Sequence, residues 1–314
     1  MRIRTYEEVD PAEAFRLSIL AFGGAWTEEM VRRTRGRDPR YFDEFALYAE
    51  ENGRILAQAV PMRFRVHLAT GIEEVGGIGG VCTHPAFWGR GYARRLMEEV
   101  HGRFRKLGLR ISTLTTSRNI RGYELYSRLG YAELGPFFGA SRRVPSQKPP
   151  KGYRLARTTP KDLPSIHDLY RRHTRDLLGW TERDLRQLEW NFARNRRTLS
   201  KYRLLQHEGE TVGYLRTRPD DQVTMEEVVV PSARHFNAAV ALMERGAANR
   251  IATVNWITAA KDAARFRSRG YMVDGPIPDT TMALGLASGL RTSDLPRLFG
   301  SDSGRFVQYP SDDF

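Results

Sequence analysis

The chain is poor in cysteine and has no long uninterrupted run of apolar residues. It holds a single Cys among 314 residues, which excludes an intrachain disulfide framework and a zinc cluster built on cysteines. No stretch approaches the roughly 18 uninterrupted apolar residues of a transmembrane helix. Residues 1–15 lack the apolar segment of a secretory signal peptide. We therefore expect a cytoplasmic protein with no membrane partner.

Acidic residues are outnumbered by basic ones. The chain has 50 Lys and Arg against 37 Asp and Glu, a formal net charge of +13. The excess is spread over both halves of the chain, so it favours anionic partners in general: nucleic acid, acidic lipid or a phosphorylated cofactor. Hydrophobic residues make up 40% of the chain and charged residues 28%. This composition is globular and excludes a mostly disordered chain.

A proline-rich segment divides the chain near its middle. Residues 144–152 read VPSQKPPKG, a composition typical of a linker. The order of expected elements before the linker recurs after it, at a spacing of about 140 residues, which is too long for a solenoid repeat. We therefore predict two tandem domains, residues 1–143 and 153–283. A tail, residues 284–314, has no counterpart in the first half.

Local patterns predict several elements in detail. An amphipathic pattern that begins with Pro11 predicts a helix over residues 11–22. Asn52-Gly53 predicts a tight hairpin that leads into a long strand over residues 54–68. In the second half we expect a helix over residues 181–195.

The strongest chemical signal lies in residues 81–93, which read VCTHPAFWGRGYA. An apolar strand stops at His84-Pro85, and a glycine-containing turn leads into a long amphipathic helix. Unpaired backbone N–H groups and the helix dipole attract anions at such a helix start. Gly89 and Gly91 would let a phosphate group approach the backbone closely. A short glycine pattern is weak by itself, so an ordinary strand-to-helix turn is the alternative.

A second motif, NIRGYELYSRLGY, occupies residues 119–131. Taken together, the two motifs resemble those of the GNAT family of acetyl-CoA-dependent N-acetyltransferases. The first corresponds to R/Q-x-x-G-x-G/A and the second to N-x-x-A-x-x-x-Y-x-x-x-G-F/Y. The matching residues are Gly89, Gly91, Ala93, Asn119, Tyr126, Gly130 and Tyr131, with Gly122 in place of the usual Ala. Trp88 departs from the pattern, because the family usually has Arg or Gln there. The duplicated layout is most similar to the Eis-type acetyltransferases.

This resemblance implies a fold and a cofactor. The implied fold class is α/β (α+β), with two tandem GNAT folds, each a mixed, mostly antiparallel twisted sheet flanked by helices. The implied cofactor is acetyl-CoA, a co-substrate, without a metal, and the implied partner is an amine. Backbone groups of Val81, Cys82 and Thr83 would pair with the pantetheine arm. The pyrophosphate would be held by backbone groups of Gly89, Arg90, Gly91, Tyr92, Ala93 and Arg94.

The resemblance also implies roles for individual side chains. Asn119 would touch the pantetheine or a bound water. Tyr126 would protonate the departing CoA thiolate, and Tyr123, one helical turn earlier, is the second choice for that acid. Cys82 lacks an activating His/Asp set, so we do not expect it to be a nucleophile. We expect His84 to be structural.

The second half and the tail differ from the first half. The second half has no glycine at residues 232–237, where the loop would lie, and it has Phe266 at the place of Tyr126. We expect it to bind no CoA and to build the acceptor pocket and an interface for a homo-oligomer. In Eis-type enzymes the terminal carboxylate is thought to enter the active site. The carboxylate of Phe314 is therefore a candidate base for the amine, and a frayed terminus is the alternative.

Two other functions share this layout. One is an aminoacyl-transferring twin-GNAT enzyme of cell-wall synthesis, against which the intact phosphate loop argues. The other is a non-catalytic, nucleic-acid-binding GNAT scaffold, for which no aromatic and basic patch stands out, so we do not expect nucleic acid as a partner. The acceptor amine is not named by the sequence. An acidic acceptor pocket could be formed by Glu28, Glu29, Asp43 and Glu44.

Overall fold

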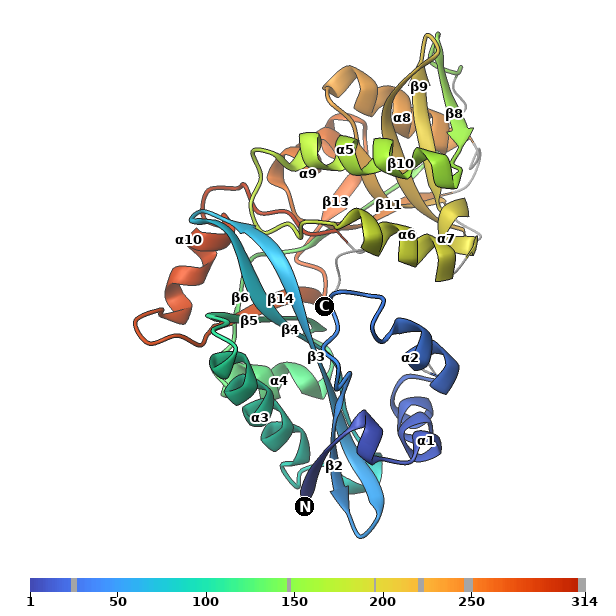
Figure 1. Ribbon diagram of the computed structural model, residues 1–314. Helices are drawn as coiled ribbons and strands as arrows, with labels where there is room; N and C mark the ends of the chain where they lie inside the picture. The colour runs from blue at the N-terminus through green and yellow to red at the C-terminus, as the bar shows by residue number, and fades with distance from the viewer. Residues whose placement is uncertain (24–26, 146–147, 195, 220–222, 246–250, 310–314) are drawn as a thin grey trace.

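The computed structural model describes residues 1–314 apart from 24–26, 146–147, 195, 220–222, 246–250 and 310–314. Within these residues the chain forms two seven-stranded sheets, one above the other in Figure 1. Most strand pairs are antiparallel, and helices flank both sheets. The predicted fold class is therefore confirmed.

The first sheet has the strand order β1-β2-β3-β4-β5-β14-β6. Two helices, α1 (Pro11–Phe22) and α2 (Glu28–Thr34), cover one face, and α3 (Tyr92–Lys106) and α4 (Arg121–Arg128) cover the other (Figure 1). Each face buries its own apolar core, so the sheet is the middle layer of a three-layer unit. The strands are β1 (Arg2–Thr5), β2 (Leu47–Glu51), β3 (Arg54–Leu68), β4 (Gly71–Thr83), β5 (Ile111–Ser117), β6 (Ala132–Glu133) and β14 (Asp279–Gly285).

The second sheet has the order β13-β7-β12-β11-β10-β9-β8. One face packs against α5 (Leu163–Thr174) and α6 (Leu185–Arg194), which α7 (Arg196–Ser200) follows, and the other against α8 (Ala233–Arg245) and α9 (Ala260–Ser268). Its strands are β7 (Phe138–Arg143), β8 (Tyr153–Arg157), β9 (Tyr202–His207), β10 (Glu210–Pro219), β11 (Val223–Val229), β12 (Ile251–Ile257) and β13 (Met272–Asp274). Among the described residues, no helix combines the length and the apolar character needed to cross a membrane.

Local sequence patterns found most of these elements. The helix over residues 11–22 and the strand over residues 54–68 are confirmed at both ends. Asn52 and Gly53 have φ of 51° and 75°, the positive values that a two-residue hairpin turn of this type requires.

The helix predicted over residues 181–195 is wrong at its start, because α6 begins only at Leu185. The preceding segment is extended and pairs with the end of β3. The N–H of His67 donates to the carbonyl of Trp180 at 3.0 Å, and the N–H of Glu182 donates to the carbonyl of Arg65 at 2.7 Å. Pairing with a distant strand has overridden the local helical pattern.

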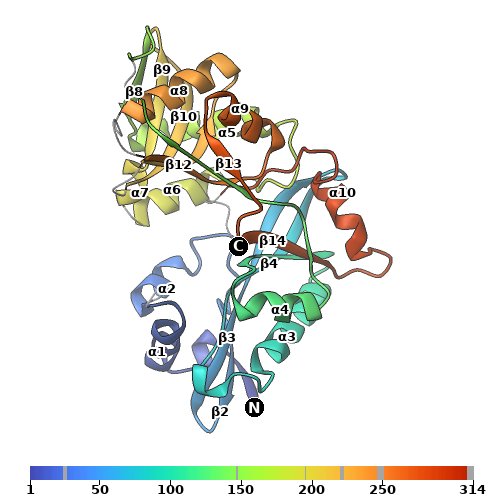
Figure 2. The same ribbon diagram turned by 180° about the vertical axis from the view of Figure 1, so that it is seen from behind.

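The two sheets exchange strands. β7 precedes the linker, yet it pairs with β12 and β13 of the second sheet. β14 follows the linker, yet it pairs with β5 of the first sheet, from Asp279–Ser117 to Gly285–Ile111. Figure 2 shows the green β7 in the upper sheet and the red β14 in the lower one. The predicted division at residues 144–152 therefore does not separate the sheets strand by strand, because strands pair with the open edge that they reach in space.

The last described residues of the tail, 306–309, are buried and not frayed. After the short helix α10 (Leu295–Phe299), residues 306–309 run between the two halves and are all buried. The side-chain amide of Gln308 donates to Thr115 Oγ1 of β5 at 3.2 Å, and its backbone N–H donates to Thr258 Oγ1 at 2.9 Å. Thr258 directly follows β12, so the tail ties the first sheet to the second.

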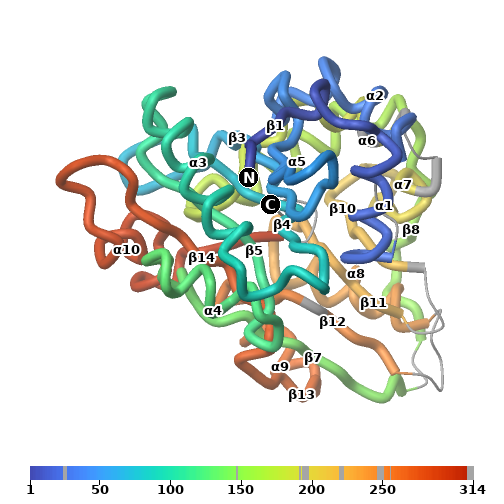
Figure 3. The backbone as a smooth tube through the Cα atoms, turned by 90° about the horizontal axis from the view of Figure 1, so that it is seen from below, coloured from blue at the N-terminus to red at the C-terminus, as the bar shows by residue number. Residues whose placement is uncertain are grey.

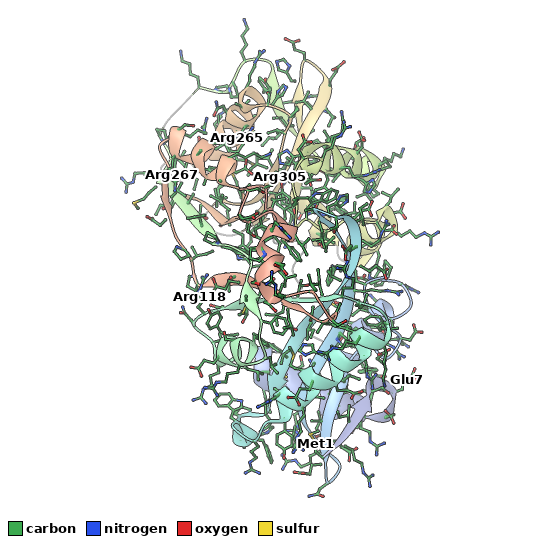
Figure 4. All side chains as sticks on the ribbon, turned by 90° about the vertical axis from the view of Figure 1, so that its left-hand side faces the viewer. Met1, Glu7, Arg118, Arg265, Arg267 and Arg305 are labelled. Atoms are coloured by element: carbon green, nitrogen blue, oxygen red, sulfur yellow. The ribbon has the colours of Figure 1, made fainter. Side chains whose placement is uncertain are left out.

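Arg118 makes another link at this junction and lies near the middle of the molecule (Figure 4). Its guanidinium donates to the carbonyl of Ile277 at 2.7 Å and pairs with Glu133. Its backbone N–H donates to the carbonyl of Pro278 at 2.8 Å. These bonds fix the start of β14 beside the end of β5.

Candidate active site

β4 and β5 run parallel and then separate. They pair at Gly76–Ser112 and Gly77–Thr113, and the described residues show no further pairing toward their carboxyl ends. Gly80 has φ of +57°, and the register of β4 against β3 shifts at this level. Such a bulge bends a strand away from its neighbour. The first sheet therefore opens at the carboxyl end of β4, and both strands lie between α1 on one side and α3 on the other (Figure 3).

A cleft of about 1020 Å³ lies at this opening, at the upper end of the usual range for small-molecule sites. The end of β4, the loop before α3, the first turn of α3, α4 and the last turn of α1 form its walls. Most of the predicted site residues line it. These are Val81, Cys82, Thr83, Gly89, Gly91, Tyr92, Ala93, Arg94 and Tyr126.

Two predicted residues do not line the cleft. The guanidinium of Arg90 lies 5.0 Å from the ring centroid of Phe87. Asn119 is exposed, and its backbone N–H donates to Ser117 Oγ at 3.4 Å. Any contact of these two side chains with a ligand in the cleft stays a prediction.

The loop before α3 has the backbone that its glycines predicted. Gly89 and Gly91 have φ of +76° and +80°, and a Cβ at either position would meet no atom within 4 Å. The space over the loop is therefore open. Gly91 is the N-cap of α3, so the first N–H groups of a 15-residue helix point into the cleft, where an anion would be stabilised.

Tyr126 also brings a phenol side chain to the wall of the cleft. Its side chain is 6% exposed, and burial raises the pKa of Tyr126 to about 12. The hydroxyl is therefore protonated at neutral pH and can donate a proton or a hydrogen bond. Its ring lies over Gly122, where an added Cβ would be 3.3 Å from the hydroxyl oxygen. The missing methyl group at Gly122 leaves room for this ring position.

Tyr123, the second choice for the acid, does not line the cleft. Its hydroxyl donates to Glu133 Oε1 at 2.9 Å. That hydrogen bond to a carboxylate raises the pKa of Tyr123. Geometry therefore favours Tyr126.

A buried polar cluster supports the helix that carries Tyr126. The hydroxyl of Tyr131 lies 2.8 Å from His101 Nε2 and 2.6 Å from Ser112 Oγ. Burial lowers the pKa of His101 to about 4, so this imidazole is neutral. The rings of Tyr131 and Tyr126 pack edge to face, with centroids 6.1 Å apart. The Gly-Tyr that ends the second motif is thus a structural support for the phenol.

Cys82 and His84 lie at the carboxyl end of β4. Burial raises the pKa of the Cys82 thiol to about 12, which disfavours the thiolate at neutral pH. His84 Nδ1 accepts a hydrogen bond from the N–H of Ala86 at 3.2 Å. This bond caps the 3₁₀ turn Pro85–Phe87.

The first half of the chain matches a known family of domains. Residues 2–134 match the model of the acetyltransferase (GNAT) domain. Residues 2–134 are therefore similar to a GNAT domain. No curated protein sequence matches the chain at a significant level.

Several solved structures share the fold over 91% of the chain. A probable N-acyltransferase from Enterococcus faecalis superimposes with a TM-score of 0.70 at 19% identity over 72% of its own length. Eis1 from Mycobacterium abscessus does so with a TM-score of 0.63 at 16% identity over 74% of its length. A GCN5-related N-acetyltransferase from Kribbella flavida has a TM-score of 0.62 at 18% identity over 72% of its length. These likenesses extend over both sheets and show the fold.

Among the described residues, the second half repeats the parallel strand pair of the first half but has a much smaller cavity beyond it. β11 and β12 pair in parallel from Val223–Ala252 to Met225–Val254. The cavity beyond these pairs measures only about 30 Å³. Phe236 and Phe266 pack edge to face there, with centroids 5.0 Å apart, and the tail adds Val307, Gln308 and Tyr309. Aromatic rings and the tail therefore occupy the space that is open in the first half.

Sequence reasoning missed two parts of the site. The last turn of α1 contributes Leu20 and Phe22, which are exposed and line the cleft. Arg121, the first residue of α4, also lines it and lies against Trp88. The exposed apolar face at the end of α1 was a signal for the first, whereas the contact between Arg121 and Trp88 joins two motifs and had no local signal.

Two further expectations concern ligands. Within the described ranges, no group of three or more His, Cys, Asp or Glu side chains could hold a metal ion. Asp312, Asp313 and Phe314 lie outside the described residues, so the role of the Phe314 carboxylate stays a prediction.

Proposed function

We propose that the protein transfers an acetyl group from acetyl-CoA to a primary amine of a small molecule or peptide. The observation that carries this proposal is the single cleft that joins the glycine loop at the start of α3 to the Tyr126 phenol. A phosphate site and a proton donor in one cleft suit a long phosphorylated thioester. Bound acetyl-CoA would supply an activated acetyl group.

Different residues of the cleft have different roles in this reaction. Val81–Thr83 lie where β4 has left β5, so their backbone is available to pair with the pantetheine arm and to polarise the thioester carbonyl. The N–H groups at the start of α3 hold the pyrophosphate. As the amine nitrogen attacks the carbonyl carbon and the C–S bond breaks, the Tyr126 hydroxyl donates to the departing sulfur. The amine must lose a proton, for which Phe314 is the candidate base.

Charges around the site bear on the acceptor. Of the four acids that could form an acidic acceptor pocket, Glu29 pairs with Arg32 and Arg33, and Glu44 pairs with Arg103. The charged residues that line the cleft are three arginines and Glu124, which itself pairs with an arginine. A polycationic acceptor would be repelled here. We therefore propose an acceptor with one amine and an apolar body, which Leu20 and Phe22 would contact.

The test measures CoA binding by calorimetry and acetyl transfer by release of free thiol against a panel of amines. Gly91→Glu should abolish CoA binding, because it places a carboxylate at the phosphate site. Gly108→Glu is the matched control, since Gly108 lies at the other end of α3 with a similar φ of +77° and open space around it. CoA affinity that is the same in the wild type and in Gly91→Glu would contradict the proposal.

A further inference from the structure

Trp88 is held in place by a hydrogen bond to β4. Its indole Nε1 donates to the carbonyl of Thr83 at 2.8 Å. The ring is nevertheless 51% exposed, and it lines the cleft immediately before Gly89. The indole is thus a fixed flat surface beside the phosphate loop.

Arg121 stacks on that surface from the other wall of the cleft. Its guanidinium carbon lies 4.8 Å from the centroid of the Trp88 ring. Stacking on an aromatic face leaves the N–H edge of a guanidinium free to bind planar or tetrahedral oxyanions. The contact spans from the loop to the first residue of α4.

Arg121 differs from the other two arginines that line the cleft. Arg94 pairs with Glu98 at 2.9 Å, and Arg128 pairs with Glu124 at 3.1 Å. In the part of the chain that the structure describes, no carboxylate pairs with Arg121. A guanidinium that lies in a cleft, is held by stacking and has no such partner is ready for an anionic ligand.

We propose that Arg121 binds the pyrophosphate of CoA and that Trp88 positions Arg121 for this contact. This inference rests on the proposed function and deepens it. The side-chain N–H donors that Arg or Gln usually supplies at the first loop position come here from α4, and the indole of Trp88 at that position supports the guanidinium. Holding the guanidinium in advance reduces the ordering cost of binding.

The experiment is a calorimetric series with CoA, dephospho-CoA and pantetheine on the full chain. Arg121→Gln should weaken the binding of CoA and of dephospho-CoA by roughly 10- to 100-fold, because one charge-assisted hydrogen bond to phosphate is lost. It should leave the binding of pantetheine, which has no phosphate, unchanged. Arg95→Gln is the control for net charge, since Arg95 is exposed on α3 and does not line the cleft.

The role of Trp88 is tested by a double-mutant cycle. Trp88→Leu removes the stacking surface and should weaken CoA binding, and the double variant Trp88→Leu/Arg121→Gln should be little weaker than Arg121→Gln alone. Arg121→Lys keeps the charge without the planar group and should recover only part of the affinity. Circular dichroism checks that each variant is folded.

The outcomes are distinct. If the wild type binds CoA and Arg121→Gln binds it equally well, the inference is wrong while the proposed function stands. If Arg121→Gln lowered the affinity for pantetheine as much as that for CoA, the effect would be structural, and this would also overturn the inference. If the wild type itself does not bind CoA, the proposed function and the inference fail together.

Discussion

Replacing Tyr126 by Phe removes one hydroxyl group from the cleft and leaves the ring in place. Among the described residues this hydroxyl makes no hydrogen bond, so the free energy of unfolding should change by less than about 1 kcal/mol. A positioned general acid contributes roughly 10²- to 10⁴-fold to a rate. We therefore expect kcat to fall at least about 100-fold while the affinity for CoA stays the same.

The pKa of Tyr126 sets the pH dependence of this effect. Burial raises it to about 12, whereas a free thiol has a pKa near 8.5. Complete proton transfer to the thiolate is therefore uphill by roughly 3.5 pKa units, about 5 kcal/mol. The phenol then acts mainly by hydrogen bonding to the sulfur as negative charge develops. Since the phenol is protonated below its pKa, its ionisation should not lower kcat between about pH 7 and pH 10.

The assay is thiol release from acetyl-CoA with an amine that the panel identifies, together with thermal unfolding. Tyr131→Phe is the first matched control, because it breaks two buried hydrogen bonds, to His101 and Ser112, and should lower stability by about 2 kcal/mol. Tyr123→Phe is the second, because Tyr123 does not line the cleft and its loss should change kcat little. Turnover of Tyr126→Phe near the wild-type rate would refute the reasoning, as would an alkaline decline in kcat near pH 10 that Tyr126→Phe abolishes.

Three further predictions concern other parts of the chain. Gly76→Ala should destabilise the fold by roughly 1–3 kcal/mol in denaturant unfolding, since a Cβ there would lie 2.3 Å from the ring of Phe104. Gly102→Ala is the control: Gly102 lies in α3, the helix that carries Phe104, with open space around it, and this change should be neutral or stabilising. Cys82→Ala should keep turnover within a few-fold, because the thiol has a pKa of about 12, and a large loss of turnover would reinstate a nucleophilic cysteine. Deletion of residues 310–314 should lower kcat/KM for the amine and leave CoA affinity in calorimetry intact, and normal turnover would exclude a base in this segment.

Most features that the sequence predicted correctly depend on patterns within a few neighbouring residues. The glycine loop, the start of α3 and the position of Tyr126 depend on neighbours within a few residues, because positive φ values, helix caps and helical faces are local properties. Short-range patterns also indicated that the second half lacks the glycine loop and the tyrosine of the first half. The missing glycines and Phe266 were visible in the sequence, and the structure has a cavity of only about 30 Å³ at that place.

The sequence by itself determined the two sheets with their helices, the glycine loop before α3 and the place of Tyr126 on α4. Only the tertiary structure decided which strands complete each sheet, because backbone hydrogen bonds join any two edges that meet and carry no record of sequence order. It also decided the course of the tail, whose Gln308 bonds to both sheets. The contact of Arg121 with Trp88 is likewise a feature that only the tertiary structure decided. It requires two segments 33 residues apart to converge, which depends on the packing of α4 against β5.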